Sequence, residues 1–259
     1  MALQSKSLSK ASGIEYLDYF DGDEPNRAKS RVYSTFDFGA KTREIFLKIK
    51  QPKFIYLSLN APHGPISAPE NLIREMQKEH PTISYSRAEY LATIKAIDLE
   101  MEKIVRTVKS KGEKRDTIII FQSDNGGVTF NKALKSKGGG HIRLGCNFPY
   151  KGEKTLLTEG GTLVPAYAYS VKGTIRPKVY DGIFHITDWF PTILSLAKVK
   201  KSAVANWKRI DGINQISVLT QQKTVKQPRT NMVYGMIDSD SPILLKNFAK
   251  FSCNFSFQR

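Results

Sequence analysis

The feature that most constrains the fold is a long amphipathic pattern that lies between two short apolar runs. Between residues 90 and 108, apolar side chains recur at alternating steps of four and three: Tyr90, Ile94, Ile97, Met101, Ile104 and Val108. This spacing predicts a helix with one apolar face, and Gly112 predicts where the helix ends. The two runs, 54–59 and 117–121, are partly β-branched and predict buried strands. A strand, a long helix and a strand in this order indicate a right-handed crossover in a parallel sheet, so we expect an α/β fold.

Further elements are predicted downstream, where the pattern weakens towards the end of the chain. A third strand is expected at 163–169, and a helix at about 188–197, where Pro191 is tolerated because it lies in the first turn. Two short candidate strands follow at 216–219 and 231–237, in sequence that is rich in Lys, Gln and Thr. We therefore predict that a smaller subdomain begins after residue 200.

The charge balance restricts the classes of partner. The chain has 259 residues, with 40 Lys and Arg against 24 Asp and Glu, and a formal charge of +16. Its densest basic stretches, 132–143 and 198–209, show neither interleaved aromatic residues nor a helix-turn-helix pattern, so no nucleic-acid partner is predicted. Polyanionic sugars or small anions suit such a surface equally well. No apolar run is long enough to cross a bilayer.

The cysteines and the first residues of the chain indicate in which cellular compartment the protein is expected. Cys146 and Cys253 are too few for a disulfide framework and lack the paired spacing of a zinc site. One disulfide bond or two free thiols both stay open. The first ten residues contain no apolar segment of the kind found in signal peptides, so the chain as written has no export signal. Either the protein is intracellular, or its true beginning is missing.

Two of the predicted strands end in residues that can carry chemistry. The first strand leads to His63, which lies between two prolines, and the second leads to Asp124, Asn125 and two glycines. Carboxylate and amide oxygens are the ligands that calcium and magnesium prefer, and glycines let the backbone approach a ligand closely. The alternative is a plain tight turn at 124–127, because Asp, Asn and Gly favour turns. By itself, His63 is best interpreted as a structural or surface histidine.

A segment rich in lysine and glycine precedes the third predicted strand. It contains Lys151, Lys154 and the glycine pair 160–161. One interpretation is a solvated basic loop, and this suits Lys151. The functional interpretation is that one lysine points inward as a positive charge for a tetrahedral anion.

The other histidines and one aspartate are predicted to have no chemical role. His185 and Asp188 are expected to be structural, since they lie at the start of a helix and Asp188 can cap it. His80 and His141 are expected at the surface.

These segments, taken together and in order, resemble the sulfatase family, and most of all its arylsulfatase B type, the N-acetylgalactosamine-4-sulfatase-like group. The resemblance covers roughly residues 15–220. The segments that carry it are 16–22, 32–35, 54–65, 120–127, 149–161 and 185–192. It implies an α/β, alkaline-phosphatase-like sheet flanked by helices and incomplete at the N-terminus. On this basis, residues 1–200 are a partial catalytic domain and residues 201–259 are the start of a C-terminal subdomain.

The resemblance also implies roles for individual residues. Asp124 and Asn125 match the family's ligands of an active-site calcium, and Lys154 matches the lysine that contacts the sulfate. His63 matches the histidine on the sulfate and leaving-group side. The implied activity is hydrolysis of sulfate esters, with a sulfate ester or a sulfated glycan as partner. The parent protein is then expected to be lysosomal or secreted, where the sequon at Asn254 matters.

The family's nucleophile, by contrast, has no match in the chain. It is a formylglycine made from a cysteine in a Cys-x-Pro-Ser-Arg type motif, and neither Cys146 nor Cys253 lies in one. The paired aspartates that supply further calcium ligands are also absent. We expect an N-terminally truncated fragment without sulfatase turnover of its own. The alternatives are a non-catalytic binder of sulfated glycans and a phosphate or phosphonate ester hydrolase of the same superfamily.

Overall fold

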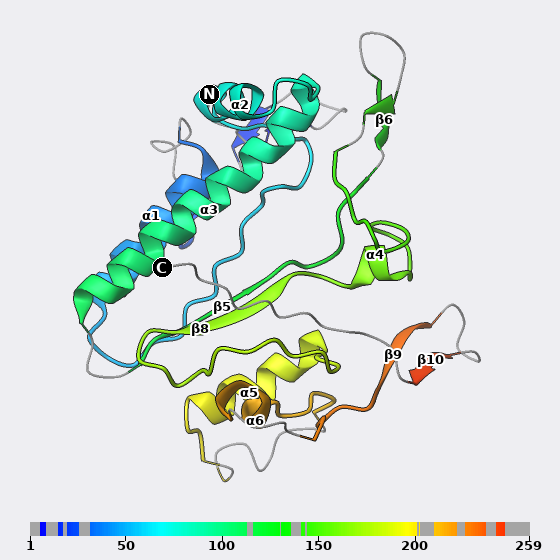
Figure 1. Ribbon diagram of the computed structural model, residues 1–259. Helices are drawn as coiled ribbons and strands as arrows, with labels where there is room; N and C mark the ends of the chain where they lie inside the picture. Colours follow the sequence, from blue (N-terminus) through cyan, green and yellow to red (C-terminus); the bar gives the residue numbers. More distant parts are fainter. Residues whose placement is uncertain are drawn as a thin grey trace. The chain divides into compact units, whose positions relative to one another are not determined.

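The computed structural model divides into two compact units (Figure 1), which are described one at a time. Unit 1 comprises Met1–Glu113 and Phe130–Gly145, and unit 2 comprises Lys114–Thr129 and Cys146–Arg259. The structure describes residues 6–8, 15–17, 20–25, 32–112, 116–129, 131–135, 141–142, 144–200, 202, 210–221, 226–236 and 242–246. None of the helices within these ranges is long and apolar enough to cross a membrane.

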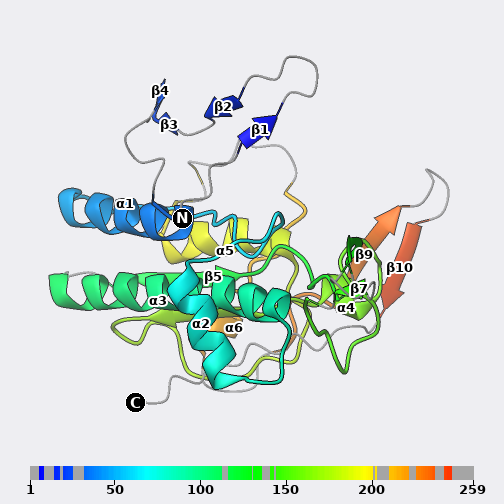
Figure 2. The same cartoon turned by 90° about the horizontal axis from the view of Figure 1, so that it is seen from above.

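Unit 1 is dominated by three helices, and its strands form short hairpins. The helices are α1 (Ser34–Lys48), α2 (Glu70–Glu79) and α3 (Tyr85–Lys111). The antiparallel pairs are β1 (Lys6–Leu8) with β2 (Glu15–Leu17), β3 (Phe20–Asp21) with β4 (Glu24–Pro25), and β6 (Asn131–Lys135) with β7 (His141–Ile142). Both α1 and α2 pack against α3 (Figures 1 and 2).

Helix α3 confirms the prediction from the amphipathic pattern. The Ser84 side chain caps its first turn by accepting a hydrogen bond from the backbone of Arg87 at 3.3 Å, and Gly112 ends it in the left-handed conformation. Small side chains recur every four residues on its buried face, at Ala88, Ala92 and Ala96, and all three are fully buried. This stripe lets α2 approach closely, so the core of unit 1 forms between these helices.

The predicted buried strand at 54–59 is wrong in two respects. The segment has no strand partner among the described residues, and its side chains alternate between half-buried and exposed. Phe54 is 71% exposed and Tyr56 is 83% exposed. Strand formation depends on a partner elsewhere in the chain, and a short apolar run does not reveal whether one is present.

Unit 2 is built around a two-stranded sheet. The strands β5 (Ile118–Gln122) and β8 (Ala166–Ser170) pair antiparallel, with Ile118 opposite Ser170. Two predicted strands are thus confirmed, but the parallel pairing with 54–59 is not observed among the described residues, and β5 instead pairs with a strand that follows it. At the end of this sheet, Asp116 accepts hydrogen bonds from the Ser170 hydroxyl at 2.6 Å and from the backbone of Lys172 at 2.8 Å.

Helices cover one face of this sheet (Figure 1). A single 3₁₀ turn, η1 (Ile186–Asp188), leads into α5 (Trp189–Leu196), as the sequence predicted, and α4 (Glu159–Thr162) precedes β8. Trp189 packs on Phe184 with their ring centroids 4.3 Å apart, and its indole nitrogen donates to the Gln122 side chain at 2.5 Å. The core of unit 2 therefore lies between β8 and α5.

The predicted strand at 216–219 is a helix, α6 (Ile216–Thr220), whereas the strand at 231–237 is confirmed as β9 (Asn231–Met236). Strand β9 pairs antiparallel with β10 (Pro242–Lys246). In α6 the consecutive residues Val218 and Leu219 are both buried, which suits a helix better than the alternation of a strand. A four-residue apolar run does not by itself distinguish these cases.

Asp188 and His185 are structural, as the sequence predicted, although the Asp188 side chain caps the η1 turn rather than α5. The Asp188 carboxylate is fully buried and accepts hydrogen bonds from the His185 backbone at 2.9 Å and from the Arg229 guanidinium at 2.6 Å. Gln215 and the Ile213 backbone also donate to it, at 3.1 Å and 2.7 Å. Burial raises the pKa of Asp188, but these hydrogen bonds outweigh burial and place the pKa below its usual value.

The predicted boundary between a catalytic domain and a C-terminal subdomain at residue 200 stays a prediction.

Candidate functional site

Asp124 and Asn125 follow directly after β5, at the carboxyl end of that strand. Asp124 is exposed, and its carboxylate accepts no hydrogen bond from the described residues. The Asn125 amide nitrogen donates to the Gly126 carbonyl at 2.9 Å, and the Ser123 hydroxyl donates to the Asn125 carbonyl at 2.9 Å. These bonds fix the bend and leave the Asn125 side-chain oxygen available, so two hard oxygen donors lie side by side along the chain.

Glycines allow this bend to touch the loop before β8. The Gly126 backbone donates to the Gly161 carbonyl at 2.9 Å, and a Cβ atom on Gly126 would lie only 1.8 Å from the Gly160 carbonyl oxygen. A Cβ on Gly160 would in turn lie 2.2 Å from the Gly152 oxygen. Since any side chain at these positions would collide with backbone, the glycines are required for the close approach.

The loop 147–154 is fastened at both ends to Gly127. The Asn147 side chain accepts from the Gly127 nitrogen at 3.2 Å and donates to the Gly127 oxygen at 2.8 Å. At the other end, the Lys154 backbone donates to the same Gly127 oxygen at 3.3 Å. The predicted anion-binding lysine therefore lies on a loop tied to the residue two positions after Asn125.

Additional bonds hold the interior of this loop. The Asn147 amide also donates to the Gly152 carbonyl at 3.0 Å, and Gly160 donates to the Lys151 carbonyl at 2.8 Å. The Glu153 carboxylate accepts from both the backbone and the hydroxyl of Thr129, at 2.7 Å and 2.6 Å. Asn147, Glu153 and Thr129 were not singled out from the sequence, because their roles depend on partners about 20 residues away.

The two lysines of the loop differ in exposure. Lys151 is exposed, as expected for a solvated lysine, whereas Lys154 is half-buried. A half-buried ammonium group interacts more strongly with an anion than a fully solvated one, because less water screens it. Of the two, Lys154 is therefore better suited to hold a sulfate group.

His63 belongs to unit 1, and the site residues of unit 2 are described without reference to it. Its backbone closes a turn by donating to the Asn60 carbonyl at 2.8 Å, and its ring Nδ1 lies 2.7 Å from the Gly64 carbonyl. That contact orients the ring, and the side chain is exposed. His63 can therefore present its other nitrogen, Nε2, to a ligand in solution.

The remaining histidines and cysteines were also predicted from the sequence. His80 is exposed at the end of α2, as predicted. The His141 side chain lies outside the described part of the structure. Cys146 is an exposed free thiol, while Cys253 and Asn254 lie outside the described residues.

The residues present fit part of a calcium site. Carboxylate and amide oxygens are the right donors for a hard cation, but calcium usually takes six to eight oxygen ligands. Among the described residues, no group of three or more His, Cys, Asp or Glu side chains could hold a metal ion. Asp124 and Asn125 therefore provide a minority of the ligands that such a site needs.

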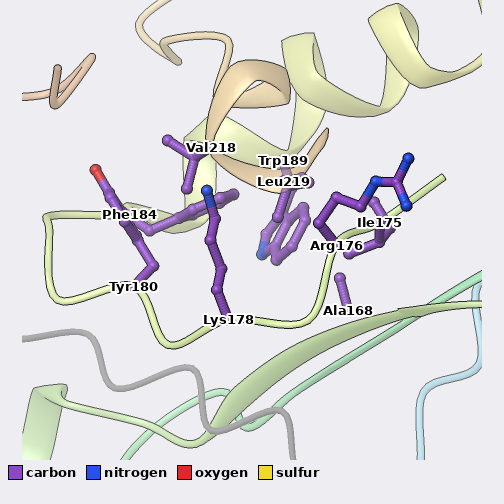
Figure 3. A pocket seen from close by; sticks show the side chains of 9 residues that line it. All are labelled: Ala168, Ile175, Arg176, Lys178, Tyr180, Phe184, Trp189, Val218 and Leu219. Atoms are coloured by element: carbon purple, nitrogen blue, oxygen red, sulfur yellow. The ribbon is translucent and has the colours of Figure 1, made fainter. Parts of the chain in front are cut away.

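A separate apolar pocket lies between β8 and the helices of unit 2 (Figure 3). Its walls include Ala168, Phe184, Trp189 and Leu219, and the stems of Arg176 and Lys178 border it. None of the residues predicted for the site lines this pocket. Because its surface is almost entirely apolar, it is unsuited to an anion, and it belongs to the packing of the core.

Comparison with known proteins places these features in context. Residues 11–199 match the protein-family model described as Sulfatase. The chain is 30% identical to the uncharacterized sulfatase YdeN of Escherichia coli over 186 residues, and 29% identical to mouse arylsulfatase J over 169 residues. It is 26% identical to human N-acetylgalactosamine-6-sulfatase over 213 residues. These matches cover 72%, 64% and 76% of this chain but only 30%, 26% and 37% of the relatives, so the chain spans about a third of their length.

Solved structures show the same relationship at the level of the fold. Two crystal structures of Ps i-CgsB, one of them in complex with k-i-k-neocarrahexaose, each match with a TM-score of 0.61. The sequence identities are 25% and 26%, and each match covers 81% of this chain and 44% of the other.

Proposed function

Because the chain belongs to the sulfatase family, we propose that it carries part of the site of a sulfate ester hydrolase. Asp124 and Asn125 contribute oxygen ligands to a divalent cation, for which calcium is the expected ion. Lys154 pairs with the sulfate group. His63 acts at the ester oxygen that leaves with the alcohol.

These roles follow from the charge changes in the reaction. As the S–O bond breaks, negative charge gathers on the leaving oxygen, and the nonbridging oxygens carry charge throughout. A cation and an ammonium group placed beforehand stabilise this distribution without reorganising during the reaction. A histidine that donates a proton to the departing oxygen avoids the release of an alkoxide.

The observation that carries the proposal is the double attachment to Gly127. The Asn147 side chain and the Lys154 backbone both bind this residue, which follows the Asp124–Asn125 pair by two positions. Lys154 lies 30 positions after Asp124 in the chain, yet hydrogen bonds join the two segments that carry them. This supports a shared site for the cation and the anion in unit 2.

The chain as given is not expected to turn over substrate, because neither cysteine lies in the nucleophile motif and the paired aspartates are absent. With an aryl sulfate, we expect no metal-dependent, saturable hydrolysis. Within the family, an arylsulfatase B-like specificity for N-acetylgalactosamine 4-sulfate is our proposal for the parent protein. A lysosomal or secreted location is part of the same proposal.

Anion binding by the purified chain tests the proposal directly. Titration with inorganic sulfate should give an affinity that Lys154→Ala lowers about tenfold, as expected for loss of a charge-assisted contact. Lys200→Ala removes an exposed lysine of the same unit and serves as the matched control. Equal affinities of the two variants would argue against a sulfate contact at Lys154.

A second candidate function is non-catalytic binding of sulfated glycans, which the net charge of +16 favours. The two functions differ in their dependence on calcium. For a hydrolase-type site, calcium should raise the affinity for sulfate, and Asp124→Asn should abolish this increase. Sulfate binding that is indifferent to both calcium and Asp124→Asn would support the non-catalytic function.

A further inference from the structure

The loop that carries Lys154 also exposes an unusual set of apolar side chains. Phe148 is 87% exposed, the highest value among the large apolar side chains described as exposed. Tyr150 on the same loop is 38% exposed, and Leu156 and Leu157, which follow the loop, are 49% and 45% exposed. Exposed apolar groups that gather on one surface often mark a binding site.

Several hydrogen bonds hold the backbone of this loop, even though Phe148 and Lys151 are exposed. Asn147 and Lys154 fasten its ends to Gly127, and Gly160 holds the Lys151 carbonyl at 2.8 Å. Tyr150 closes a turn by donating to the Asn147 carbonyl at 2.8 Å, so Phe148 lies within that turn. The exposed aromatic ring is therefore carried by a pre-ordered backbone, which lowers the entropy cost of binding.

The attachment to Gly127 also limits how far the loop can extend. Six residues separate its two anchors, so its tip reaches at most about 10 Å from them, given about 3.4 Å per extended residue. Phe148 and Lys151 are hence confined to a region near the Lys154 backbone. A sugar ring with one sulfate group spans a comparable distance.

We infer that Phe148 and Lys151 form a sugar-binding subsite next to the sulfate site, a proposal that rests on the proposed function. The Phe148 ring stacks on the apolar face of the sugar that bears the sulfate ester. Lys151 pairs with a second anionic group of the same glycan, such as the carboxylate of a neighbouring uronic acid.

Three probes separate these contributions in titrations of the purified chain. Methyl sulfate offers only the anion, N-acetylgalactosamine 4-sulfate adds the ring, and the chondroitin 4-sulfate disaccharide adds a carboxylate. Phe148→Ala should lower the affinity for both sugars about three- to tenfold and leave methyl sulfate unchanged. Lys151→Ala should lower the affinity for the disaccharide alone, about threefold, and high salt should reduce this difference.

Two control variants remove similar groups elsewhere. Phe54→Ala deletes a phenylalanine of unit 1 that is 71% exposed, and Lys200→Ala deletes an exposed lysine of unit 2. Neither should change the affinity for any of the probes. Thermal melts of every variant show whether the loop substitutions disturb the fold.

The outcomes distinguish this inference from the function on which it rests. If Phe148→Ala changes no affinity while Lys154→Ala weakens all three probes, the subsite is wrong and the sulfate site stands. If Lys154→Ala has no effect, the proposed function itself is wrong. A Phe148→Ala variant that weakens all three probes equally, or an unaltered chain that does not bind N-acetylgalactosamine 4-sulfate, overturns the subsite.

Discussion

Glu100 in unit 1 and Asp188 in unit 2 are equally buried carboxylates whose charges are compensated differently. Their side chains are 1% and 0% exposed. Glu100 binds Arg43 and Lys103, whose side chains remain 23% and 50% exposed. Asp188 binds Arg229, which is only 10% exposed, together with two backbone N–H groups and the Gln215 amide.

This difference separates two ways of stabilising a buried charge. The cations of Glu100 keep contact with water, so they lose little if the carboxylate is removed. Arg229 is largely shielded from water and is neutralised by Asp188 instead. Removal of either partner therefore leaves an uncompensated buried charge. The Asp188 network also joins segments that are 25 to 41 residues apart, whereas Lys103 and Glu100 lie three residues apart on one helix.

The largest expected effect tests the closed network of unit 2. Asp188→Asn should lower the free energy of unfolding by about 3–5 kcal/mol, because Arg229 stays buried without its counter-charge. Urea titration followed by tryptophan fluorescence measures this, since both tryptophans of the sequence lie in unit 2. Asp181→Asn, at an exposed position of the same unit, is the control. A loss below 1 kcal/mol would remove the contrast with Glu100.

A somewhat smaller loss is expected where the backbones of unit 2 touch. Gly126→Ala should cost about 2–3 kcal/mol, because its Cβ would collide with the Gly160 carbonyl. The variant should also weaken sulfate binding, since the same contact positions the Lys154 loop. Gly173→Ala is the matched control: its positive φ of 82° is strained by alanine, but no atom lies within 4 Å of the added Cβ. Equal losses in the two variants would contradict a role for the close contact.

The corresponding change in unit 1 should be milder. Glu100→Gln keeps the shape of the side chain and removes its charge from two cations that can turn to solvent. We expect a loss of about 1 kcal/mol, measured by urea titration with circular dichroism, which follows the long helices of this unit. A loss as large as that of Asp188→Asn would show that exposure of the partner does not decide the cost.

The smallest expected effect is a difference between the two units in how their stability changes as the pH falls. Hydrogen bonds place the pKa of Asp116 and Asp188 below its usual value, so their stabilisation is present above about pH 4 and is lost as the pH falls through the folded-state pKa. In unit 1, burial raises the pKa of Asp37, Glu89 and Asp98, so protonation on acidification favours the folded state.

Tryptophan fluorescence should thus report loss of unit 2 on acidification before circular dichroism reports loss of the helices. Asp116→Asn should make the acid limb of the fluorescence transition shallower. Coincident transitions of the two signals at every pH would show that the units do not differ in this way.

Local patterns in the sequence predicted α3, α5, β5, β8 and β9, but not α1, α2 or the short hairpins of unit 1. Helix α3 was predicted from its 3.6-residue periodicity and from Gly112 at its end, and neither signal depends on distant contacts, whereas its Ser84 cap was not singled out. The wrong predictions concern segments whose secondary structure depends on the length of the apolar run or on pairing with a distant segment. The run at 216–219 was too short to distinguish a helix from a strand, and the pairing of 54–59 depends on chain elsewhere.

The candidate site was predictable as a set of residue types but not as a network. Asp124 and Asn125 stand out because these oxygen donors follow a predicted strand, and Lys154 stands out because it lies in a segment rich in lysine and glycine before the next one. The contacts that join them run through Asn147 and Gly127, 20 positions apart, and nothing in the local sequence indicates that pairing. In the same way, Asp188 was identified as a cap, while its partner Arg229 lies 41 positions away.

The glycine contacts have a consequence for how such a protein diversifies. Positions that tolerate only glycine, such as 126, 152 and 160, flank positions whose side chains are exposed, such as 148 and 151. New side chains at the outward positions can change which ligand is preferred while the glycine framework stays as it is. Ligand preference and architecture can therefore evolve separately within one short stretch of polypeptide.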